Sequence, residues 1–193
     1  NLISIINQKV QTLNTDITQL NRLITSNNTK IQDLKRETRQ LLSAVKQEEN
    51  KVPRIKSKIS NLKQQIQTLK QKVSQLENSQ SNAKRNLQAA KQAYTEAYNR
   101  CTARGTADCS STQEIVTLKQ KIVTAKNKLR IIANQLSDIK RDYQAQNSKL
   151  VTLQGKLQQA QRNISSYKQK VSRNSQTILS LKNSNTNSSS NLR

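Results

Sequence analysis

The fold of this chain is decided by IKSKISNLKQQIQTLKQKVSQL, residues 55–76, in which aliphatic residues recur at alternating steps of four and three. All the remaining positions in this stretch are occupied by Lys, Gln, Ser, Asn or Thr. A repeat that averages 3.5 residues is typical of supercoiled helices, because it keeps one apolar stripe turned toward a partner helix. The stretch therefore predicts a coiled coil.

The same repeat extends in phase over most of the chain, as two series of seam positions that heptad notation calls a and d. The first series runs from residue 3 to residue 101, and the second from residue 115 to residue 181. Because the phase does not change at Pro53, we expect a kinked helix there and not a turn. Polar residues interrupt the two series at a few positions: Asn27, Thr38, Glu48, Gln80, Gln146 and Asn174.

The composition suits a narrow seam better than a globular core. The 193 residues are 32% hydrophobic and 2% aromatic, and they include no Phe, Trp or Met, one Pro and two Gly. So few bulky side chains and turn formers predict an elongated all-α domain. No apolar run approaches the roughly 18 residues of a membrane span, so we expect no membrane segment.

A short segment between the two series contains Gly105 and is bracketed by the only cysteines, Cys101 and Cys109. We expect this segment to be the tip of an antiparallel hairpin, closed by a disulfide bond, with Thr112 capping the second helix. Such a bond would indicate an oxidising compartment. Two reduced thiols and bridges between chains are the alternatives.

In an antiparallel pair, the numbers of facing seam residues have a constant sum, and a sum of 212 centres the hairpin near Gly105. This register sets small residues opposite large ones along the seam. It also brings Thr38 opposite Asn174, and Asn27 opposite Asn185. Matched volumes and paired polar groups both favour it. The competing interpretation is a parallel dimer, because the first series places mainly Ile or Val at a and Leu at d.

These patterns divide the chain into an N-terminal helical overhang (1–30), a first hairpin helix (31–100), a tip loop (101–111), a second helix (112–182) and a Ser/Asn-rich tail (183–193). The tail has too little apolar surface to fold alone, so we expect it to be flexible unless it docks in an assembly. The overhang carries an apolar stripe beyond the second helix, which we expect another chain to cover. Its assembly residues are Ile3, Ile6, Val10, Leu13, Ile17, Leu20 and Ile24. A partial outer stripe on the second helix consists of Val116, Val123, Val151 and Leu179.

The net charge of +23 arises from 34 Lys and Arg against 11 Asp and Glu. Lysines crowd the e and g positions beside the seam, where like charges such as Lys84 and Lys126 would face each other, with Lys72 and Asp142 as a relieving pair. An acidic protein or a polyanion would account for the excess, and a merely solvated surface is the simpler explanation. The candidate partner-binding face comprises Lys56, Lys63, Lys70, Lys84, Lys91, Lys119, Lys126 and Lys140.

The chain has no His and no Gly-rich phosphate loop, and its carboxylates are scattered. We therefore expect no catalytic residues, no metal, no cofactor and no small-molecule substrate. The expected function is structural: a secreted or extracytoplasmic rod with a processed N-terminus that assembles with itself, or with acidic partners, into an extracellular filament or matrix. The alternatives are a coiled-coil hairpin whose tip docks a receptor or serves as an adaptor, and a polyanion-binding spacer.

Overall fold

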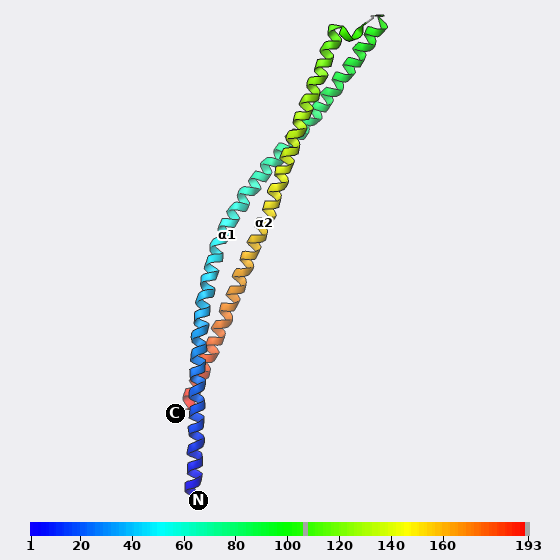
Figure 1. Ribbon diagram of the computed structural model, residues 1–193. Helices are drawn as coiled ribbons and strands as arrows, with labels where there is room; N and C mark the ends of the chain where they lie inside the picture. Colours follow the sequence, from blue (N-terminus) through cyan, green and yellow to red (C-terminus); the bar gives the residue numbers. More distant parts are fainter. Residues whose placement is uncertain (106–107, 192–193) are drawn as a thin grey trace. The chain divides into compact units, whose positions relative to one another are not determined.

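The computed structural model describes residues 1–105 and 108–191 (Figure 1). These residues form two long α-helices, α1 (Leu2–Ala103) and α2 (Gln113–Asn191), and a short 3-10 helix, η1 (Cys109–Ser111). No strand occurs within the described ranges. The two long helices pack against each other in opposite directions, which confirms the all-α antiparallel hairpin.

Helix α1 runs without interruption through Pro53. Proline has no backbone N–H, so the carbonyl of Glu49 lacks its usual intrahelical donor at this point. The apolar seam has the same phase on both sides, as Val52 and Ile55 are both partly buried. Seam packing therefore keeps the segment helical, and the prediction that Pro53 does not form a turn is confirmed.

The chain divides into two compact units. Unit 1 consists of Asn1–Lys56 and Gly155–Arg193, so it pairs the N-terminal half of α1 with the C-terminal half of α2. Its best-buried apolar residues are Ile31, Val45 and Ala160, all at seam positions. Asn27, also at a seam position, is only 7% exposed.

Unit 2 consists of Ser57–Gln154, which includes the tip of the hairpin. The most tightly buried residues of this unit are Ala97 and Ile115, at 2% and 1% exposure, and their numbers sum to 212. Other buried seam residues are Ile59, Leu62, Ala83, Ile132 and Leu136. The small residues let the two backbones approach, while the large ones fill the space opposite them.

Direct contacts fix the register of the helices in unit 1. The amide nitrogen Nδ2 of Asn27 donates to Oδ1 of Asn185 at 2.8 Å, and Nδ2 of Asn174 lies 3.4 Å from Oγ1 of Thr38. Both pairs have residue numbers that sum to 212. The predicted antiparallel register is confirmed.

The structure corrects the predicted end of the second helix. Helix α2 does not stop at residue 182 but continues through the polar segment to Asn191. The seam continues with it, because Asn185 and Ser188 occupy the next a and d positions, and Ser188 is 6% exposed. The polar tail is thus helical where it packs on α1, since polar side chains there find partners across the seam. Residues 192–193 lie outside the described residues.

We predict that cysteines introduced at Ala90 and Ile122 form a crosslink within a single chain, because the two positions face each other at the sum of 212. Mass spectrometry of a dilute, oxidised sample measures the crosslink. The control combines Ala90→Cys with Leu129→Cys, which lies one heptad, or about 10 Å, further along α2. Equal crosslinking of both combinations would contradict a single register.

Candidate interaction surfaces

The tip of the hairpin is closed by a disulfide bond between Cys101 and Cys109, with 5.8 Å between the Cα atoms. Cys101 lies in the last turn of α1, and the buried Cys109 begins η1. Gly105 has a φ of +73°, a left-handed conformation that costs glycine little. The predicted disulfide is confirmed. Thr106 and Ala107, which complete the predicted tip loop, lie outside the described residues.

Polar contacts order the chain between the disulfide and α2. Oδ1 of Asp108 accepts hydrogen bonds from the backbone N of Ser110 at 3.0 Å and from its hydroxyl at 2.6 Å. These bonds, led by the one from the Ser110 side chain, hold the pKa of Asp108 below its ordinary value of 3.8. The ionised carboxylate thus caps η1.

Thr112 directly precedes α2, as predicted, and its carbonyl accepts a hydrogen bond from the backbone N of Val116 at 3.0 Å. Its hydroxyl, however, donates to the carbonyl of Cys109 at 3.0 Å. Arg100 and Glu114 form an ion pair of 3.0 Å across the base of the tip. The side chains of this region thus tie the ends of both helices to the disulfide.

A polar layer closes the seam at the other end of the hairpin, in unit 1. Nδ2 of Asn27 donates to Oδ1 of Asn185, and Nδ2 of Asn185 in turn donates to Oδ1 of Asn28 at 2.9 Å. Nδ2 of Asn174 also reaches Oε2 of Glu37 at 3.2 Å. Because an unsatisfied buried amide is costly, such contacts penalise any shift of one helix along the other.

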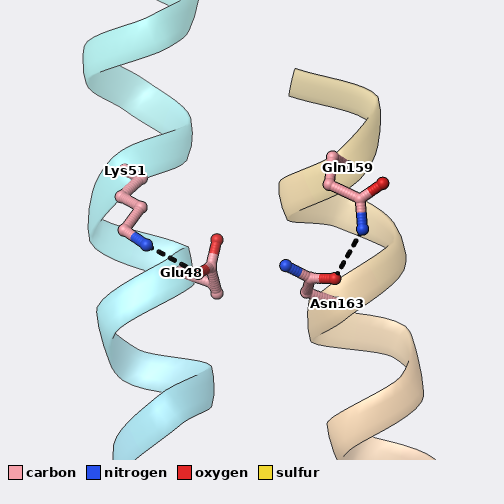
Figure 2. Close-up of polar contacts among 4 residues, drawn as sticks. All are labelled: Glu48, Lys51, Gln159 and Asn163. Atoms are coloured by element: carbon pink, nitrogen blue, oxygen red, sulfur yellow. Dashed lines mark hydrogen bonds and ion pairs between the residues drawn. The ribbon is translucent and has the colours of Figure 1, made fainter. Parts of the chain in front are cut away.

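Glu48 is a carboxylate at a seam position, on the side of α1 that faces α2 (Figure 2). Its side chain is 15% exposed and forms an ion pair of 2.7 Å with Lys51. On α2, the side-chain amide of Gln159 likewise finds its partner within its own helix, because Nε2 donates to Oδ1 of Asn163 at 2.9 Å. Glu48 is thus paired with a lysine of its own helix.

The basic residues lie at the surface on both sides of the seam. All eight lysines of the candidate partner-binding face are exposed. One of them, Lys140, pairs with Glu77 at 2.8 Å, and Lys168 pairs with Glu49 at the same distance. Among the described residues, no ion pair joins Lys72 to Asp142, although both occupy g positions; this relieving pair was predicted wrongly. An ion pair between exposed, long side chains contributes little to the free energy of folding. Each carboxylate can therefore pair with any of several neighbouring lysines.

The N-terminal part of α1 extends beyond the end of α2 within unit 1 (Figure 1). Its stripe residues are open to solvent: Ile3 is 75% exposed, Leu13 59% and Val10 49%. Flanking Leu2 and Leu23 are exposed as well, at 72% and 44%. The stripe is shorter than predicted, because Leu20 and Ile24 are partly buried near the end of α2. The predicted assembly residues from Ile3 to Ile17 thus form one exposed apolar surface.

The predicted outer stripe of α2 is also exposed: Val116 at 46%, Val123 at 48% and Val151 at 68%. The sequence interpretation missed Leu42 and Ile131, which are 51% and 53% exposed. The signal for both was present, because each forms an aliphatic doublet with a seam residue, and only one member of a doublet can enter a narrow seam.

A shallow hollow lies between the helices of unit 2 where the seam is built of small residues. Ala83, Ala90 and Ala125 line it, with Lys121 and Lys128 on one rim. No cluster of Cys, Asp and Glu in the described ranges could hold a metal ion. Nor is any helix of the described part long and apolar enough to cross a membrane.

No protein-family model matches the chain, and neither curated proteins nor solved structures provide a match.

We predict that reducing the tip disulfide destabilises the hairpin by about 2 to 3 kcal/mol on the chain-entropy model. Hydrogen exchange should accelerate in the turns next to Cys101 and Cys109 while the polar layer of unit 1 keeps its protection. A variant with both cysteines replaced by Ser should behave like the reduced protein and should not respond to reductant. Unchanged exchange near the tip would contradict a stabilising role of the bond.

We predict that Asn185→Ala weakens the polar layer at a cost of about 1 to 3 kcal/mol, because it removes the nearer acceptor of the buried Asn27 amide, at 2.8 Å, and leaves only the Ser184 hydroxyl at 3.5 Å. Hydrogen exchange of the seam around residues 24–31 and 181–188 measures this. The matched control is Asn187→Ala, at an exposed position of the same helix. Equal effects of the two substitutions would show that the contact with Asn27 does not matter.

Proposed function

We propose that this chain is a non-catalytic structural protein that assembles with copies of itself through the N-terminal part of α1. The observation that carries the proposal is the change in exposure along a single heptad series. Ile31 and Val45 are 5% and 6% exposed where α2 covers them, whereas Ile3 and Ile6, in the same series, are 75% and 50% exposed.

An aliphatic side chain gains about 1.5 to 3 kcal/mol when it is fully buried. The exposed stripe contains several such side chains in a row, with the spacing that a partner helix requires. Scattered apolar residues are common on protein surfaces, but a contiguous stripe indicates a binding surface. A helix that continues the seam of the hairpin is the covering that fits the spacing.

The proposed setting is extracellular, in a filament or matrix. The bond between Cys101 and Cys109 supports it, because disulfides persist in oxidising compartments. The shape of the surfaces supports a structural role over an enzymatic one, since the hollows between the helices are shallow and open to solvent.

Co-assembly with an acidic partner is the second candidate, and the exposed lysines favour it. Long stretches of the chain lack acids, for instance everything after Asp142. Most lysines beside the seam therefore have no acid within the chain to neutralise them, and a partner with an acidic surface would relieve their mutual repulsion.

We predict that a variant with Ile6, Val10 and Leu13 replaced by Ser loses self-assembly and keeps its helix content. The three side chains are open to solvent in the single chain, so the hairpin does not need them. Light scattering measures assembly, and circular dichroism measures helicity. The matched control replaces three other exposed aliphatic residues, Val116, Val123 and Val151, with Ser.

Added salt distinguishes self-assembly through the apolar stripe from co-assembly through the lysines. An apolar self-contact hardly weakens in salt, whereas a contact between lysines and an acidic partner is screened. If the variant altered at Ile6, Val10 and Leu13 assembles normally and high salt alone disperses the material, the lysines hold the assembly and the proposed mechanism is wrong.

A further inference from the structure

We infer that the N-terminal stripe pairs with the same stripe of a second copy, in antiparallel orientation and in one defined register. This inference rests on the proposed self-assembly and specifies its partner and geometry. It follows from the rules that the hairpin itself obeys, applied to residues 2–23 of α1, which are exposed apart from the partly buried Leu20.

The hairpin shows how an antiparallel pair of these helices is arranged. Facing seam residues have a sum of 212, as in the contact of Asn27 with Asn185. The ion pair of Arg100 with Glu114 joins two g positions. Their residue numbers have a sum of 214, which is two more than the sum of 212 for facing seam residues. The two ion pairs between e positions, from Lys140 to Glu77 and from Lys168 to Glu49, have a sum of 217, five above the seam value.

For two copies of the stripe, a seam sum of 23 places every exposed a position opposite a d position. The contact is symmetric, because each pair occurs twice about a twofold axis. The resulting apolar pairs are Ile3 with Leu20, Ile6 with Ile17, and Val10 with Leu13.

The flanking residues are self-complementary at the same register. Pairs of g positions then have a sum of 25, which brings Lys9 of one copy to Asp16 of the other. The sum also sets Leu2 against Leu23, so the two exposed flanking leucines cover each other. Pairs of e positions have a sum of 28 and are all asparagine: Asn7 with Asn21, and Asn14 with its own copy.

The neighbouring antiparallel registers are disfavoured by charge. If the overlap between the two copies were one heptad shorter, at a seam sum of 16, Lys9 of one copy would face Lys9 of the other. One heptad longer, at a sum of 30, Asp16 would face Asp16, and Ile3 would reach Asn27, which α2 already covers. Like charges at such positions repel. Only the register at 23 combines ion pairs with a free apolar surface.

A parallel pairing would lose these complements. In a parallel pair a g position lies near the e position five residues further along the other helix. Leu2 would then face Asn7, and Lys9 would face Asn14, so there would be no ion pair and no leucine contact. A parallel pair would also direct both strongly basic hairpins to the same side, whereas the antiparallel pair directs them to opposite ends.

The overlap ends where α2 begins to cover α1. In the register at 23, Ile3 of the second copy reaches Leu20, which lines a hollow together with Ile17, Leu23 and Asn191 at the end of α2. The first turn of the second copy would fall at this hollow. The charged side chains of residues 1–29 are only Lys9, Asp16 and Arg22, so little repulsion opposes the approach of the two copies.

Cysteine crosslinking of the full chain tests the register. The native cysteines are bonded to each other, so Val10→Cys and Leu13→Cys each add one reactive thiol. We expect disulfide-linked dimers when the two single variants are mixed, refolded together and mildly oxidised, and few when either is oxidised alone. The matched control mixes Val10→Cys with Ile17→Cys, whose facing positions lie one turn apart.

A charge exchange gives an independent readout. Lys9→Glu places a carboxylate against Asp16 twice per dimer, and Asp16→Lys places two lysines together. Each single substitution should weaken the dimer roughly tenfold or more at low salt, measured by sedimentation. The double variant, with both charges exchanged, restores the pairing and should recover dimerisation. Circular dichroism verifies that these surface variants stay helical.

The outcomes separate this inference from the proposed function. If each single cysteine variant crosslinks with itself as readily as in the mixture, the pairing is parallel; the inference is then wrong while self-assembly stands. If scattering shows assembly but no combination crosslinks, another surface or occupant covers the stripe, and the inference is again wrong. If the unaltered chain stays monomeric at every concentration tested, self-assembly and this inference both fail.

Discussion

Antiparallel seam packing at a residue sum of 212 is the constraint on which the rest of the structure depends. The apolar spacing requires some partner helix, but it would tolerate slippage by whole heptads. Three features remove this freedom: alanines face large aliphatic residues near the tip, Asn27 binds Asn185, and the disulfide at Cys101 fixes the turn. Once the register is set, every e and g side chain has its neighbours assigned, so the surface follows from the seam.

The charge distribution follows from the same constraint. Acids are few, so the register decides which lysines meet one: Lys140 reaches Glu77 and Lys168 reaches Glu49, while most other lysines are left to solvent. The segment beyond the end of α2 differs, because it carries Lys9 and Asp16 in balance. The basic hairpins of two copies thus repel each other along their length. The nearly neutral N-terminal segment is where two copies can approach.

Most of the fold could be predicted from the sequence, because in a coiled coil the spacing of apolar residues determines both the helices and their contact. The register was also predictable, since two pairs of polar seam residues, Thr38 with Asn174 and Asn27 with Asn185, share the sum of 212. The end of α2 was not, because helix propensity alone disfavours a run of Ser and Asn; it is the seam contact of Asn185 and Ser188 that keeps the segment helical. The choice of ion pairs escaped prediction as well, since exposed partners such as Lys72 and Asp142 differ from competing pairs by less than about 1 kcal/mol.

An isologous contact closes on itself, because both copies use the same surface. Pairing of the N-terminal stripes therefore yields a dimer, and a filament or matrix needs a second kind of contact. The lysines beside the seam cannot supply it directly, since two basic faces repel; an acidic partner between them removes the repulsion. In the proposed assembly, self-assembly and co-assembly are then successive levels: the apolar stripe makes the dimeric building block, and an acidic partner bound to the lysines links the blocks. In such an assembly salt weakens the linkage and spares the dimer, because the proposed dimer relies mainly on aliphatic pairs such as Ile6 with Ile17.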